Sequence, residues 1–114
     1  MKFTRYTISM GLNDKDTLRP VDTYEHASIE VAGRLSQLDV SCTITRGTGV
    51  YKHERGDVVI EETVVISIID FDGTAGAKLG AFINGVKRDY NQESVAVVTD
   101  SIESELREGL TKLV

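Results

Sequence analysis

The order of periodic segments predicts a ferredoxin-like fold, an α+β two-layer sandwich in which two helices cover one face of an antiparallel β-α-β-β-α-β sheet. Three observations lead to this prediction: strand-like alternation at the start and in two central segments, two helical stripes, and an apolar run after the second stripe. We expect residues 1–99 to form this domain. We expect residues 100–114 to form an acidic C-terminal tail that is a short helix or disordered.

The first strand and the first helix are predicted by two different periodicities. Residues 2–10 alternate with period two, which is typical of a strand with one buried face. Asp22 followed by Glu25 has the spacing of a helix N-cap with a capping box. Apolar residues then recur every three or four positions, which predicts a helix over residues 23–38. The residues of this stripe are Tyr24, Ala27, Val31, Leu35 and Leu38.

The central segments predict a long β-hairpin with a defined register. Apolar residues of one parity lie on both sides of a turn in which Gly56 is able to take a positive φ. A three-residue loop would pair His53 with Asp57 and would place Val50 opposite Ile60. A two-residue turn would instead set the apolar face of one strand against the polar face of the other. The pattern therefore favours the three-residue loop.

The same register puts two charged side chains on the core-facing side of the hairpin. Glu62 lies opposite Thr48, and Arg46 is its diagonal neighbour. A carboxylate among apolar residues is costly to desolvate unless it is paired. Three interpretations stay open: the two are solvated where the hairpin extends beyond the helices, they form a buried structural pair, or they form a ligand or partner site.

The second half of the chain predicts one more helix and one more strand. Residues 72–74 have the character of a helix start, and the apolar run over residues 94–98 suits a central strand. Residues 101–108 are expected to form a short helix, and residues 109–114 to be frayed. The apolar stripe of the second helix consists of Ala75, Leu79, Phe82, Ile83, Val86 and Tyr90.

Composition and charge exclude several classes of protein. The 114 residues are 40% hydrophobic and carry a net charge of −5, whereas a nucleic-acid partner requires a basic surface. No apolar stretch has the length of a membrane span and the start is strand-like, so we expect no membrane partner and a cytoplasmic protein, in the host cytoplasm if phage-encoded. The lone Cys42 permits no internal disulfide.

A recognisable catalytic set is missing from the sequence. His26 falls on a predicted helix and His53 at a hairpin tip, so they suggest neither a metal site nor a catalytic triad. Residues 47–49 and 73–76 resemble fragments of phosphate loops but lack the lysine and the spacing of the complete motifs. We therefore expect no catalytic residues, no metal and no cofactor.

Three segments carry a family resemblance. Residues 49–51 and 61–66, followed by residues 90–95, resemble a family of small bacterial and phage proteins of uncharacterised activity. In that family a long hairpin carries a glutamate, and the last strand opens with a Gln-Glu-Ser-Val signature, here Gln92 to Val95. The resemblance covers most of residues 2–98. It implies a ferredoxin-like fold and carries no established activity.

Gln92 and Glu93 lie where the second helix leads into the last strand. Gln92 can bond the free carbonyl groups of the helix end. Alternatively, Gln92, Glu93 and Ser94 stand at the mouth of a cleft between the sheet and the loop that contains Asn13.

The other face of the sheet has no helices over it in a two-layer fold. Apolar residues among threonines on that face are typical of an interface, so we expect a homo-oligomer, a dimer or higher. The predicted interface residues are Thr43, Thr45, Val59, Thr63, Val65 and Ile69.

Two functions compete. The first is a non-enzymatic binding protein, phage- or prophage-encoded, that captures a host protein or a small signalling ligand, for example as an antagonist of host defence. The alternative is a small cofactor-independent dimeric enzyme of the ferredoxin-like kind. Arg46 with Tyr51, repeated by symmetry across a subunit interface, would supply the positive charge for a small anionic ligand. The candidate ligand- or partner-binding residues are Arg46, Tyr51, Glu62, Gln92 and Glu93.

Overall fold

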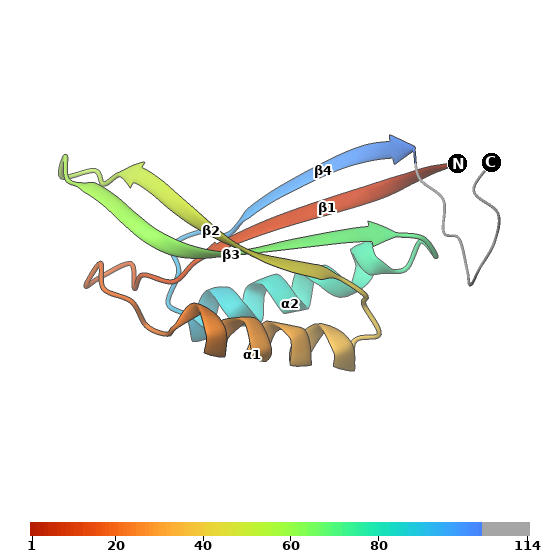
Figure 1. The fold of residues 1–114 in the computed structure, drawn as a ribbon, viewed down its shortest axis with the longest axis horizontal. Coiled ribbons are helices and arrows are strands. Elements are labelled where there is room, and N and C mark those ends of the chain that lie inside the picture. Colours follow the sequence, from red (N-terminus) through yellow and green to blue (C-terminus); the bar gives the residue numbers. More distant parts are fainter. Residues whose placement is uncertain (104–114) are drawn as a thin grey trace.

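A computed structural model describes residues 1–103 as four strands and two helices, and confirms the predicted ferredoxin-like α+β sandwich. The strands form one antiparallel sheet in the order β2-β3-β1-β4, and both helices lie on the same face of it (Figure 1). Within residues 1–103 no helix is long and apolar enough to cross a membrane. The elements are β1 (Lys2–Gly11), α1 (Tyr24–Gln37), β2 (Thr43–Lys52), β3 (Val58–Asp70), α2 (Ala75–Asp89) and β4 (Ala96–Glu103).

The core lies between the two helices and the even-numbered side chains of β1 and β3. The alternation seen in the sequence turns these side chains inward, and the helical stripes close over them. Each fully buried aliphatic side chain contributes roughly 1.5–3 kcal/mol relative to an exposed one, so this layer fixes which face of the sheet stays open. Fully buried large residues include Ile8, Met10, Leu12, Val31, Leu35, Val64, Ile66, Ile68 and Val86.

The hairpin has the predicted register. The N–H of His53 donates to the carbonyl of Asp57 at 2.7 Å, Gly56 takes φ +97°, and Val50 lies opposite Ile60. The predicted core-side position of that last pair does not lead to burial, because Val50 and Ile60 are 63% and 66% exposed. The distal part of the hairpin extends beyond both helices, so neither helix covers this face of it there (Figure 1).

The N-cap of α1 is Thr23 rather than the expected Asp22. The hydroxyl oxygen of Thr23 accepts the N–H of His26 at 3.1 Å, while a carboxylate oxygen of Asp22 accepts the N–H of Thr23 at 2.8 Å. Asp22 therefore stands one residue before the cap, where its other oxygen is available to a second partner.

The last strand begins two residues later than expected and runs further. β4 pairs with β1 from Ala96 to Glu103, so residues 100–103 belong to the sheet and not to a helix or a tail. Asp100 lies opposite Arg5, and the two side chains form an ion pair at 2.6 Å. The rest of the predicted tail, residues 104–114, lies outside the described residues.

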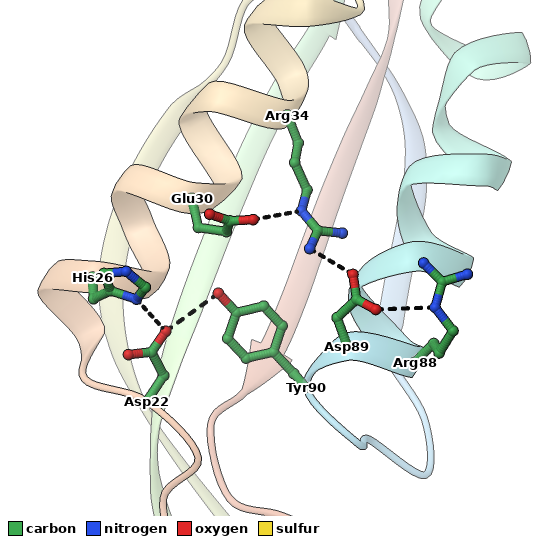
Figure 2. A network of polar contacts seen from close by, with 7 residues as sticks. All are labelled: Asp22, His26, Glu30, Arg34, Arg88, Asp89 and Tyr90. Carbon is green, nitrogen blue, oxygen red and sulfur yellow. Dashed lines mark hydrogen bonds and ion pairs between the residues drawn. The ribbon is translucent and has the colours of Figure 1, made fainter.

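A polar network connects the start of α1 to the end of α2 (Figure 2). Asp22 accepts hydrogen bonds from the ring of His26 at 2.7 Å and from the hydroxyl of Tyr90 at 3.4 Å. Arg34 donates to Asp89 at 2.6 Å across the two helices. Burial, with Asp22 as the next contribution, raises the pKa of Tyr90 to about 12, so its hydroxyl keeps its proton as the donor. The network anchors the helix end from which the chain continues to β4.

We expect the ion pair at the start of α1 to depend on pH. The hydrogen bond between the two side chains raises the pKa of His26 and lowers that of Asp22. A raised histidine pKa stabilises the fold below about pH 6.5 and a lowered aspartate pKa does so above about pH 4, so the pair contributes most between these values. NMR titration should show the pKa of His26 falling in Asp22→Asn; an unchanged pKa would contradict the pairing.

Candidate functional site

A pocket of about 440 Å³ opens on the sheet face away from the helices, where β1 ends, the hairpin extends and β4 begins. Its strand residues are mostly odd-numbered because the even-numbered ones fill the core. The strands contribute Ser9, Gly11, Gly49, Val50, Tyr51, Glu61, Thr63 and Ala96. The loops contribute Asn13, Lys15, Leu18, His53, Gln92, Glu93 and Ser94.

The carboxylate of Glu61 lies in a cradle formed by glycines of the two neighbouring strands. A Cβ atom built on Gly11 of β1 would overlap this carboxylate, and one built on Gly49 of β2 would lie 3.3 Å from Cγ of Glu61. One carboxylate oxygen accepts the backbone N–H of Asn13 at 2.9 Å. The backbone N–H of Asn13, just after β1, thus holds the carboxylate of Glu61 in place. The two neighbouring glycines, which have no side chains, leave room for it.

Tyr51 and two glutamates set the electrostatic character of the pocket. Burial raises the pKa of Tyr51, and the charges of Glu61 and Glu93 raise it further. The phenol therefore keeps its proton at neutral pH and is able to donate a hydrogen bond. Two carboxylates and the face of an aromatic ring favour a positively charged ligand or one that donates hydrogen bonds.

Gln92 forms part of the pocket wall. Its side chain is buried, and its amide nitrogen donates to the carbonyls of Asn13 at 2.7 Å and Tyr90 at 3.0 Å. Two acceptors on one side of the amide fix its orientation, since only the NH₂ group can donate. Both interpretations of Gln92 therefore hold structurally: it bonds a carbonyl at the helix end, and with Glu93 and Ser94 it lines a cleft beside the Asn13 loop.

The structure brings together three of the five predicted binding residues, Tyr51, Gln92 and Glu93. Arg46 and Glu62 lie on the other face of the sheet, beside α1. They form a solvent-exposed ion pair with each other, with side chains 52% and 46% exposed.

Arg46 and Tyr51, the predicted anion-binding residues, are not brought together within one chain. Arg46 also binds Glu25 at 3.2 Å and lies over the ring of Tyr24, 5.2 Å from its centroid. Its charge is therefore balanced by two carboxylates on the helix side of the sheet. Tyr51 is on the opposite face, so the two residues do not meet within one chain.

The predicted interface residues differ in exposure. Val59 and Thr63 are buried within the single chain, Val65 and Ile69 are half-buried, and Thr43 and Thr45 are exposed. Val98 of β4 adds an exposed apolar side chain to the same face, since it lies opposite Thr7 of β1. This face therefore has an apolar and threonine-rich half next to the pocket.

Sequence reasoning missed Glu61, Gly11 and Lys15, and it named Asn13 only as part of the loop beside the expected cleft. A signal for Glu61 was present, since the predicted register sets a carboxylate opposite Gly49 on the open face, beside the row that contains Tyr51. The predicted fold already placed the Asn13 loop beside residues 92–94, but no pattern in the loop singled out Lys15 or Leu18. Among residues 1–103 no group of three histidine, cysteine or acidic side chains is arranged to hold a metal ion.

Two solved phage proteins resemble this chain over nearly its whole length. One is a phage SAM lyase in complex with S-methyl-5'-thioadenosine, with 27% sequence identity and a TM-score of 0.69, over 93% of each chain. The other is a phage SAM lyase in its apo state, with 24% identity and a TM-score of 0.62, over 94% of each chain. No protein-family model and no curated protein matches the chain.

This similarity corrects the functional prediction. The preferred interpretation, a non-enzymatic binding protein such as an antagonist of host defence, is wrong, because the proteins that the chain resembles end to end are enzymes. The comparison favours the alternative, a small enzyme with a ferredoxin-like fold. Familiar catalytic motifs could not reveal this site, because its polar side chains come from three strands and three loops.

Proposed function

We propose that this protein is a lyase that cleaves S-adenosylmethionine and releases S-methyl-5'-thioadenosine. The observation that carries the proposal is the end-to-end similarity to a phage SAM lyase bound to that product, at 27% identity. The site supports it independently, because Tyr51, Glu61 and Glu93 make the pocket suitable for a cation. The Gln92–Val95 segment, on which the family resemblance rests, begins with three residues of the pocket wall. We also propose that the protein acts in the cytoplasm of a phage-infected host.

The charge of the substrate fits the pocket. S-adenosylmethionine carries a positive sulfonium, whereas S-methyl-5'-thioadenosine is a neutral thioether. A unit charge about 4 Å from a carboxylate near a protein surface gains about 4 kcal/mol before desolvation is counted. Glu61 and Glu93 therefore favour the substrate over the product, which promotes product release.

The reaction balances without water or a cofactor. The bond between the sulfonium sulfur and Cγ of the amino-acid chain breaks, and its electron pair stays on sulfur. Cγ must then regain an electron pair from its own fragment. Attack by the fragment's carboxylate gives a lactone, whereas loss of a proton from Cβ gives an alkene. The pocket residues bind and orient the substrate for this step.

The test is turnover by the purified protein. Incubation with S-adenosylmethionine should yield S-methyl-5'-thioadenosine, measured by chromatography, together with an amino-acid fragment that contains no oxygen from solvent. Proton NMR of that fragment separates the lactone, which keeps both Cβ hydrogens, from the alkene, which has lost one. A protein that binds S-adenosylmethionine without cleaving it would contradict the proposal.

We further propose that the chain forms a homo-oligomer through the open sheet face, a second copy covering the half that contains Val65 and Val98. Val65→Asp should dissociate the oligomer without unfolding the subunit, since it would bury an unpaired charge at a cost of several kcal/mol. Sedimentation velocity measures the effect, and Val58→Asp, at an exposed residue of the other face, is the control. A wild-type monomer at micromolar concentration would contradict the proposal.

A further inference from the structure

The loop after β1 forms one rim of the pocket and is held in a fixed shape. It folds back on itself through hydrogen bonds from Asp14 N–H to the carbonyl of Arg19 and from Leu18 N–H to the carbonyl of Asp14, each 2.8 Å. Leu18 has a φ of +59°, which a residue with a side chain adopts only where its surroundings hold it. Lys15 and Leu18 of this loop line the pocket.

Hydrogen bonds of Asn91 link this loop to the connection between α2 and β4. Its side-chain nitrogen donates to Asp14 at 2.9 Å and to Asp16 at 3.0 Å, and its carbonyl accepts the N–H of Lys15 at 3.1 Å. The hydrogen bond from Asn91 is the main cause of the lowered pKa of Asp14, so that carboxylate is ionised at neutral pH. Asn91 itself takes φ +46°.

This arrangement leaves the ammonium group of Lys15 available. The neighbouring carboxylates are already engaged, since Asp14 also accepts the N–H groups of Asp16 at 2.7 Å and Thr17 at 3.0 Å. Lys15 takes no part in the ion pairs found within residues 1–103, and its side chain is exposed at the pocket. It is the one lysine or arginine among the described pocket residues. The acidic residues that line the same pocket are Glu61 and Glu93.

We propose that Lys15, positioned by Asn91, binds the carboxylate of the amino-acid chain of the substrate and so selects adenosyl compounds that carry this chain. The inference rests on the proposed function. S-adenosylmethionine presents a carboxylate at one end and a sulfonium in the middle, and the pocket offers one cation at its rim and two carboxylates. The product keeps the adenosine portion and lacks the carboxylate, so Lys15 distinguishes the two.

Binding of two unreactive probes separates this role from a structural one. S-adenosylhomocysteine keeps the amino-acid chain, and S-methyl-5'-thioadenosine lacks it. By calorimetry, Lys15→Met should raise the Kd of S-adenosylhomocysteine about tenfold, as expected for the loss of an exposed charge-assisted hydrogen bond, and leave the Kd of S-methyl-5'-thioadenosine unchanged. Lys15→Arg should restore most of the affinity. Lys2→Met, which removes an exposed lysine at the other end of β1, should change neither Kd.

Asn91→Gly tests the positioning role, since glycine keeps the positive φ and removes only the side-chain donor. It should shift the ratio of the two Kd values in the same direction as Lys15→Met, by a smaller factor. If Lys15→Met weakens both probes equally, or neither, the inference is overturned while the proposed function stands. If the wild-type protein binds neither probe, the proposed function falls and the Lys15 inference with it.

Discussion

Glu61→Gln is expected to lower kcat/KM for S-adenosylmethionine, measured by the formation of S-methyl-5'-thioadenosine, about a hundredfold. This factor corresponds to the loss of a charge-assisted contact of about 2–3 kcal/mol. The substitution keeps the volume of the side chain and an oxygen that can accept the Asn13 N–H, which the glutamate accepts at 2.9 Å. It removes the negative charge that would face the sulfonium of the proposed substrate. The melting temperature should therefore stay close to that of the wild type, while initial rates measured over a range of substrate concentrations show the loss.

Glu62→Gln is the matched control for this prediction. Glu62 is the next residue of β3 and points to the opposite face, where it pairs with Arg46 and not with the pocket. The pair is solvent-exposed, so its loss should change the stability of the fold little. Full activity in Glu61→Gln, or an equal loss in both variants, would contradict the assignment of Glu61 to the site.

The sequence predicted the fold because its signals are local and agree with one another. The alternation in β2 and β3 and the single flexible residue of the turn, Gly56, were enough to define the hairpin register to the residue. What the sequence left open was the length of the hairpin relative to the helices. Val50 and Ile60 share the parity of the core but are exposed, because the distal part of the hairpin extends beyond both helices (Figure 1), and no residue pattern within the hairpin encodes that offset.

The site was predictable only in part, for a related reason. Tyr51, Gln92 and Glu93 were identified as candidates, yet Glu61, which lines the same pocket, was not. Glu62 was a candidate because a charge on the core-facing side is energetically unusual. Glu61, on the open face, has the pattern of an ordinary solvated carboxylate. Its role depends on Gly11 and on the N–H of Asn13, and neither contact can be read from a spacing of 48 residues between donor and acceptor.

Gly11→Ala is expected to reduce activity about as much as Glu61→Gln does, with little loss of stability. The added methyl group would overlap the carboxylate of Glu61, so this carboxylate must leave its position and its hydrogen bond with Asn13. The atoms displaced are the flexible end of one side chain and not backbone, so the free energy of unfolding should fall by less than about 1 kcal/mol. Chemical denaturation and initial rates measure the two quantities on one preparation.

Gly33→Ala provides the matched control, because Gly33 lies exposed in α1 and nothing lies within 4 Å of an added Cβ. That variant should keep full activity and gain up to about 1 kcal/mol of stability, as alanine favours a helix over glycine. The double variant Gly11→Ala/Glu61→Gln tests whether the two residues affect activity through the same contact. If Gly11 acts by leaving room for the charged carboxylate, the double variant loses no more activity than either single variant. Additive losses would mean that Gly11 affects the pocket by some route other than Glu61.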